Sequence, residues 1–172
     1  DGVDSDCDGI DGEIDAAIFV AKDGGDDNPG TIDAPMLTVE AATARAFDTG
    51  KRDVYVATGV YSESVLLRDG IGVFGGYASN FRQQNVITFE TAIIGQDPTP
   101  ERPGAVNAIN LGNDTASDPT VISGFTVFGA NAANVQSANS YAIYVRDSGS
   151  NLAVRKCRIF GGAGGAGTPG TP

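Results

Sequence analysis

The stretch VISGFTVFGA, residues 121–130, decides the fold, because its pattern returns as VRKCRIFG at residues 154–161. Aliphatic residues occupy matching places in the two copies. In each copy an apolar residue stands three positions before another one, Phe125 or Cys157. A straight strand would place two such residues on opposite faces. We therefore expect the chain to turn a corner between them, at the pairs Ser123-Gly124 and Arg155-Lys156.

Further copies extend this pattern along the chain. The order of a β-branched residue, an apolar residue and glycine also occurs at residues 73–75 and 93–95. A second strand pattern occurs twice, as AINL at 108–111 and as AIYV at 142–145. Superposition of the copies predicts three columns of inward residues. They are Val73, Ile93, Val127 and Ile159; Ile71, Phe125 and Cys157; and Ile122 and Val154. Repeats of this length indicate stacked units that bury a core only against their neighbours.

These columns and corners predict an all-β coil of parallel strands. A β-sandwich with chance repeats is the alternative interpretation. One layer departs from the rule, because Thr91 stands where other copies have Ile71 or Phe125. We expect that layer to be irregular.

Only one segment, residues 38–49, has the periodicity of a helix. Thr38 is suited to the N-cap and Gly50 to the end of the helix. The residues predicted on the buried face are Val39, Ala42, Ala46 and Phe47. A short apolar strand is expected before it, at residues 18–21.

Charge is concentrated at one end of this 172-residue chain, whose formal net charge is −11. Half of the 22 acidic residues lie in residues 1–33, against Lys22 as the single base there. The absence of a basic face argues against nucleic acid as a partner. There is no histidine, which excludes Ser-His and Cys-His nucleophiles and the usual zinc ligand. No segment is apolar enough to span a membrane, and without an initiator methionine we expect part of a longer protein.

Three stretches resemble the right-handed parallel β-helices of the pectate-lyase type found in secreted bacterial proteins. They are FVAKDGGDDNPGTIDAPMLTVEAA (19–42), DVYVATGVYSESVLLRDGIGVFGGY (53–77) and VISGFTVFGA (121–130). The resemblance implies a right-handed parallel β-helix (solenoid) over residues 18–162, with a short N-terminal cap helix. It implies no particular activity, because this coil hosts lyases, esterases, hydrolases, adhesins and binding proteins alike.

The enzymatic members of this group match the chain only in part. GVYSE at residues 59–63 is similar to the G-x-Y-x-E pattern of pectin methylesterases, but GGAGGAGTPGTP at 161–172 stands where that family has its Gln and Asp. A polysaccharide lyase would use Arg158 or Lys156 as base and Asp147 at a second calcium ion. We expect no catalytic residue in this chain, with a lyase or esterase fragment acting on acidic polysaccharide as the alternative.

The acidic N-terminal segment predicts a calcium loop. Read from Asp4, the sequence DSDCDGIDGEID fits an EF-hand-type loop that resembles thrombospondin type-3 and dockerin repeats. Alternate carboxylates converge on one cation, and glycine at the sixth position permits the sharp turn. The predicted ligands of Ca²⁺ are Asp4, Asp6, Asp8, the carbonyl of Ile10, and Asp15. A solvated acidic tail is the alternative.

The second acidic cluster and the two cysteines are interpreted without a metal ion and without a disulfide. The acidic cluster Asp23, Asp26, Asp27 and Asn28 is interpreted as a plain turn rather than a second cation site. Cys7 and Cys157 are too many rungs apart for a disulfide, and Cys157 is expected to be a buried thiol.

The sequence thus predicts a calcium-binding loop at 1–17, a parallel β-helix at 18–162 and a flexible Gly/Pro-rich tail at 163–172 where the coil is truncated. We expect a secreted or cell-surface protein with a non-catalytic binding or structural role, directed at polysaccharide or cell-surface glycan. Self-association through the coil end is a further expectation. The residues predicted to contact sugar are Tyr77, Phe81, Arg82, Tyr144 and Arg146.

Overall fold

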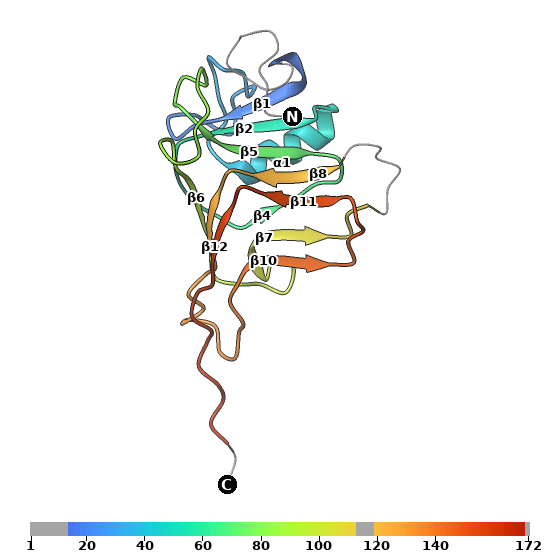
Figure 1. Cartoon of the computed structure of the whole chain (residues 1–172). Helices are drawn as coiled ribbons and strands as arrows, with labels where there is room; N and C mark the ends of the chain where they lie inside the picture. The colour runs from blue at the N-terminus through green and yellow to red at the C-terminus, as the bar shows by residue number, and fades with distance from the viewer. Residues whose placement is uncertain (1–13, 113–118, 171–172) are drawn as a thin grey trace.

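The computed structural model describes residues 14–112 and 119–170. Within them the chain forms a parallel β-solenoid of about four turns, with a single α-helix near its N-terminal end (Figure 1). This confirms the predicted all-β fold class and the parallel coil with a cap helix. The right-handed sense of the coil stays a prediction.

Three parallel sheets form the walls of the solenoid, and every strand pairing joins strands of adjacent turns. Sheet A contains β1 (Ala17–Val20), β2 (Asp53–Ala57), β5 (Gly72–Tyr77), β8 (Thr120–Ser123) and β11 (Leu152–Arg155). Sheet B contains β3 (Gly59–Ser62), β6 (Thr91–Ile94), β9 (Thr126–Phe128) and β12 (Arg158–Phe160). Sheet C contains β4 (Val65–Leu66), β7 (Gly104–Ile109) and β10 (Tyr141–Arg146).

The chain turns its corners at the two residue pairs that the three-residue spacing of apolar positions predicted. Gly124 has φ 81° and Lys156 has φ 49°, so both stand in the left-handed region that turns the chain between sheets A and B. Ile122 pairs with Val154 on one side of the corner, and Val127 pairs with Ile159 on the other. The motif that decides the fold is therefore a strand, a left-handed corner and a second strand.

One predicted column is wrong in its first member. Val73 pairs with Val54 and Ile122 in sheet A, whereas Ile93, Val127 and Ile159 form a column in sheet B with Tyr61. Ile71 likewise precedes sheet A and does not align with Phe125. The cause is an insertion, because residues 78–90 separate β5 from β6 where later turns have two corner residues.

A second alignment is also shifted. Ile143 pairs with Val106, so Ala142 stands beside Ala105 and not beside Ala108 as the AINL and AIYV strings predicted. Thr91 occupies the rung position of Phe125, as expected, and is buried. Its hydroxyl accepts a hydrogen bond from Gly76 N at 2.9 Å, which satisfies the polar group in that layer.

The helix α1 (Val39–Thr49) covers the first turn of the coil. Thr38 caps its N-terminus by accepting a hydrogen bond from Ala41 N, and Gly50 ends it with φ 69°, as predicted. Its buried face packs against β1, β2 and β4 and contains Val39, Ala42, Thr43 and Ala46. Phe47 was also predicted there, but it is 49% exposed because it lies at the edge of the last turn.

Sheet A is buried on both faces in the first turns. Its inner face lines the coil interior, and its outer face carries a second cluster of Ala17, Phe19, Ala21, Tyr55, Ala57, Tyr77 and Phe81. Phe19 and Phe81 meet edge to face, with ring centroids 5.0 Å apart. Burial on both faces explains why AIFV and VYVA are continuous apolar runs and do not alternate with polar residues.

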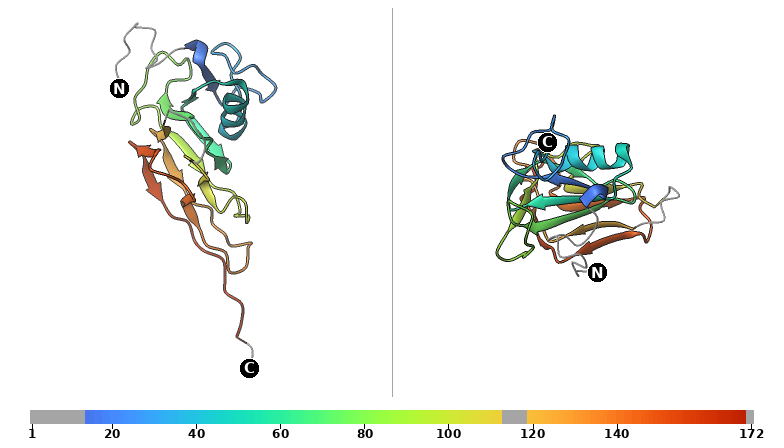
Figure 2. Two further views of the ribbon diagram at one scale, coloured as in Figure 1. Left: turned by 90° about the vertical axis from the view of Figure 1, so that its right-hand side faces the viewer. Right: turned by 90° about the horizontal axis from the view of Figure 1, so that it is seen from above.

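The turns stack along one axis, with β1 and α1 at one end and residues 161–170 leaving the other (Figure 2). Inward residues of the last turn are exposed, Val154 by 41% and Ile159 by 50%, whereas Ile122 and Val127 are fully buried. Cys157 was expected to be buried but is partly exposed for the same reason. Residues 163–166 are hydrogen-bonded to the loop at 131–138.

Candidate functional sites

Most of the predicted calcium ligands, Asp4, Asp6, Asp8 and Ile10, lie outside the described residues. Asp15 lies in the short 3-10 helix η1 (Ile14–Ala16), two residues before β1, and is exposed. Among the described residues, no three carboxylate or thiol side chains gather into a metal-binding group.

The backbone around Asp15 is attached to the end of the cap helix. Lys51 Nζ donates to the carbonyl oxygen of Asp15, and Arg52 N donates to that of Ala16 at 2.9 Å. The next residues form β1, which pairs with β2 in register from Ala17 and Asp53 onward. Asp15, at position 12 of the predicted calcium loop, thus lies where the chain enters the coil, and its backbone is held there.

The second acidic cluster forms a turn that caps the helix. Asp26 Oδ1 accepts hydrogen bonds from Leu37 N at 3.0 Å and Thr38 N at 2.9 Å, and Asp26 Oδ2 accepts one from the Thr38 hydroxyl. Asn28 donates to the Pro35 carbonyl at 2.8 Å. These bonds agree with the interpretation of this cluster as a plain turn.

The G-x-Y-x-E segment also has a structural role. Gly59 adopts φ 153°, and the buried Tyr61 hydroxyl donates to the Ala57 carbonyl at 3.0 Å. Glu63 reaches the N-terminus of α1, where its two carboxylate oxygens accept hydrogen bonds from Val39 N at 3.0 Å and Glu40 N at 2.8 Å. This carboxylate therefore satisfies helix N–H groups that have no partner within the helix.

Burial raises the pKa of the Glu63 carboxyl, and the two backbone hydrogen bonds oppose that shift only in part. The neighbouring Glu40 and Asp26 carboxylates raise it further. Burial also raises the pKa of Tyr61, to which the charge of Glu63 adds. Both groups are thus held in an environment that disfavours further negative charge.

Glu40 makes the reciprocal contact from the helix to the coil. Its Oε2 accepts a hydrogen bond from Leu66 N at 2.6 Å, and its Oε1 forms an ion pair with Arg102 at 2.5 Å. Arg102 also donates to the Ser64 carbonyl at 2.7 Å. Two glutamates and one arginine thus join α1, the corner between β3 and β4, and the loop after β6.

A pocket of about 400 Å³ opens at this junction. We call it the helix-end pocket. Its lining residues all carry polar side chains and are Thr38, Glu40, Ser62, Glu63, Ser64, Gln96, Asp97, Thr99 and Arg102. The sequence did not predict this pocket, because its residues come from three segments that only the coil brings together.

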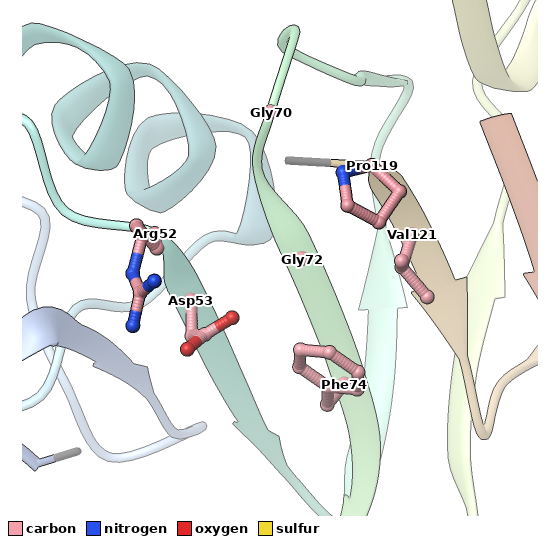
Figure 3. A pocket seen from close by; sticks show the side chains of 7 residues that line it. All are labelled: Arg52, Asp53, Gly70, Gly72, Phe74, Pro119 and Val121. Atoms are coloured by element: carbon pink, nitrogen blue, oxygen red, sulfur yellow. The ribbon is translucent and has the colours of Figure 1, made fainter. Parts of the chain in front are cut away.

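A second pocket of about 230 Å³, the sheet pocket, lies on the outer face of sheet A. Arg52 and Asp53 stand on one side of β5, Pro119 and Val121 on the other, and Phe74 lies between them (Figure 3). The backbone of Gly72 passes close to the Phe74 ring. A Cβ there would lie 2.5 Å from the ring, so a larger residue at this position would require the Phe74 ring to move.

The predicted sugar-contacting aromatics are not all exposed. Tyr77 and Phe81 are each only 1% exposed, because both pack into the cluster outside sheet A, so this part of the prediction is wrong. Arg82 and Arg146 are exposed, and Tyr144 is half-buried beside Tyr141. The predicted face therefore does not form one surface.

Exposed apolar side chains instead form a row on the outer face of sheet B. Ile94, Phe128 and Phe160 occupy the same position on successive strands and are 39%, 37% and 47% exposed. The rings of Phe128 and Phe160 stack at 5.1 Å with 14° between their planes. Each of these two rings therefore covers one face of the other.

The residues of the lyase alternative are separated by a strand. Asp147 follows β10 and pairs with Arg146, whereas Lys156 lies beyond β11 at the next corner. Arg158 is bound on the outer face of sheet B by Glu90 and by the Thr126 hydroxyl. A strand of four residues spans about 13 Å, so the structure does not bring this base and this acid together.

Cys157 is a free thiol, and burial raises its pKa. Its Sγ lies 3.1 Å from the Arg155 carbonyl oxygen. Cys7 lies outside the described residues.

Comparison with known proteins adds no name to these sites. No helix among the described residues is long and apolar enough to cross a membrane. No family model, no curated protein and no solved structure matches the chain.

Proposed function

We propose that this chain is a calcium-stabilised extracellular β-solenoid of the pectate-lyase-like type, with a non-catalytic binding or structural role directed at glycans. In this proposal Asp4, Asp6, Asp8, Ile10 and Asp15 hold one Ca²⁺ ion. The ion fastens the acidic segment to the first turn of the coil.

The observation that carries the proposal is the position of Asp15. It stands two residues before β1, and its carbonyl is bound by Lys51 at the end of α1. A cation at this loop therefore restricts the chain at the point where β1 joins β2. Calcium that binds only the folded protein stabilises it, by about 2.7 kcal/mol at one hundred times its Kd.

Calcium removal tests this role. For a chain of this size we expect EGTA to lower the melting temperature by roughly 5–10 °C relative to saturating calcium. The matched variants are Asp8→Asn, at a ligand position, and Asp11→Asn, at the eighth, non-ligand position of the loop. Both remove one negative charge. Circular dichroism melts should show that Asp11→Asn keeps the response to calcium and that Asp8→Asn loses most of it.

An unchanged melting curve in EGTA would overturn the calcium role, as would equal responses from the two variants.

The non-catalytic role has its own test, in which the protein is incubated with polygalacturonate and alginate and unsaturated product is followed by ultraviolet absorbance. We expect no product. Product formation would favour the lyase alternative.

A further inference from the structure

The helix-end pocket has walls that are already fixed. Arg102 bonds both Glu40 and the Ser64 carbonyl, and its backbone N–H donates to the Thr99 hydroxyl at 3.1 Å. Glu63 is held by two helix N–H groups. A ligand entering this space would not have to order these side chains, which lowers the entropic cost of binding.

Other groups of the pocket retain their hydrogen-bonding capacity. Among the described residues, the side chains of Ser62 and Gln96 have no hydrogen-bond partner, and Asp97 has one distant contact, with Asn134 at 3.5 Å. The Ser64 hydroxyl oxygen is buried and has no partner. The side chains of Ser62, Gln96 and Asp97, by contrast, are exposed and can reach a ligand in the pocket.

The unused groups are of mixed kind. A serine hydroxyl and a glutamine amide both donate and accept, and a carboxylate accepts. The hydroxyl groups of a sugar ring likewise both donate and accept, so they can bond to groups of either kind. The volume of the pocket falls within the range of about 300–1,000 Å³ that is usual for small-molecule sites.

The charges decide which sugars fit. Glu40, Glu63 and Asp97 line the pocket with Arg102, whose guanidinium is already paired with Glu40. Arg68, outside the lining, lies 3.8 Å from the same Glu40 oxygen, so the uncompensated carboxylates are those of Glu63 and Asp97. An added carboxylate or sulfate would meet an excess of negative charge, whereas a hydroxyl or ammonium group would not.

We infer that the helix-end pocket binds a sugar residue of a neutral or amine-bearing glycan, with Ser62, Gln96 and Asp97 as its hydrogen-bonding groups. The inference deepens the binding role proposed above and rests on it. It assigns a place and a charge class to the ligand, and it excludes uronate polymers from this pocket.

The test uses tetramers of glucose, mannose, galactose, glucosamine and galacturonate, titrated by calorimetry into the whole chain in calcium buffer. We expect at least one neutral or amine-bearing tetramer to bind and the galacturonate tetramer not to bind. Gln96→Ala and Asp97→Ala should each weaken binding about tenfold. Glu101→Gln, on the same exposed loop outside the pocket lining, should bind as the original chain does.

Melting curves establish that these surface variants fold. The inference fails if no neutral or amine-bearing tetramer binds, or if galacturonate binds best. It also fails if Gln96→Ala and Asp97→Ala leave the affinity unchanged. In that last case a glycan still binds elsewhere on the coil, so the proposed binding role survives while the pocket assignment does not.

Discussion

At the scale of single residues, carboxylates in this protein bind backbone N–H groups. Asp26 binds two of them, Glu63 binds two at the N-terminus of α1, and Glu40 binds Leu66 N. Each of these bonds joins segments that are distant in the sequence. Asp26 and Glu63, which in the sequence belong to a possible cation cluster and to an esterase-like pattern, therefore hold the N-terminal end of the cap helix in place.

Glu63→Ala should show this role in the stability of the protein. The change leaves Val39 N and Glu40 N without their acceptor, and we expect a loss of about 1–2 kcal/mol at pH 7. Glu63→Gln retains one acceptor oxygen and should lose less. Urea denaturation of the three proteins measures the differences.

The pH dependence of this loss follows from the raised pKa of Glu63. The folded protein holds the Glu63 proton to a higher pH than the unfolded chain does. The contribution of the group is therefore complete below its unfolded pKa of about 4.3 and declines as pH rises through its folded pKa. The stability gap between the original chain and Glu63→Ala should be wider at pH 5 than at pH 7. A gap that narrows on acidification contradicts the raised pKa.

At the scale of the elements, the corner between sheets A and B is the repeating unit. It places Ile122 and Val127 in adjacent walls of one interior, with Gly124 in a left-handed conformation between them. The same residue types carry different energetic weight along the coil. Ile122 has a turn on either side, whereas Ile159 lies on the last turn of the described chain and is half exposed.

Alanine substitution at these two isoleucines should separate the middle of the coil from its end. We expect Ile122→Ala to cost about 3 kcal/mol, because it leaves a cavity that neighbours on both sides prevent from closing. Ile159→Ala should cost under about 1 kcal/mol, since half of its side chain is already in water. Equal losses in urea denaturation would show that the last turn is covered in solution.

The elements also show what the sequence could predict. Local chemistry predicted the cap helix, with Thr38 and Gly50 at its ends, and the corners at Gly124 and Lys156. The register of Val73 was not predictable from the motif, because the same three-residue pattern occurs in two sheets and the insertion at 78–90 hides the change. Pairing, not residue type, determines which wall a strand joins.

The sequence did not predict the burial of Phe81 or the helix-end pocket, and the reason is related. Phe81 belongs to the inserted loop at 78–90, which folds back over sheet A and buries this side chain. A sequence pattern does not reveal where an inserted loop folds back. Arg102 and Glu40 meet across 62 positions in sequence. The composition of each segment is ordinary by itself, and the polar site exists only after the turns have stacked.

At the scale of the whole molecule, packing is uneven from one end to the other. At one end, α1 covers the interior of the first turn and the aromatic cluster covers the outer face of sheet A. At the other end, the last turn exposes Val154 and Ile159. Solenoids are stabilised by each unit and its nearest neighbours, so local stability follows local packing. The coil should therefore open from the end that carries β12.

Hydrogen exchange measured by mass spectrometry should reveal this gradient. We expect amides of β2, β5 and β8 to exchange slowest, and those of β11 and β12 to exchange many times faster. The strands of sheet B provide an internal control, since β3 and β12 have similar lengths and differ in their position along the coil. Uniform protection would show that the molecule opens in a single cooperative step.

From β5 onward every strand pairs with a strand of the turn before it, and this has a consequence for biosynthesis. In sheet A, β5 joins β2, β8 joins β5 and β11 joins β8, so after the first turn no strand waits for a segment that has not yet been made. Once residues 17–66 have left the ribosome, β1, β2 and α1 can form together with the Glu63–Val39 and Glu40–Leu66 contacts. β3 and β4 gain their strand partners with the second turn. Each later turn then finds a completed template, and the chain can assemble in the order in which it is translated.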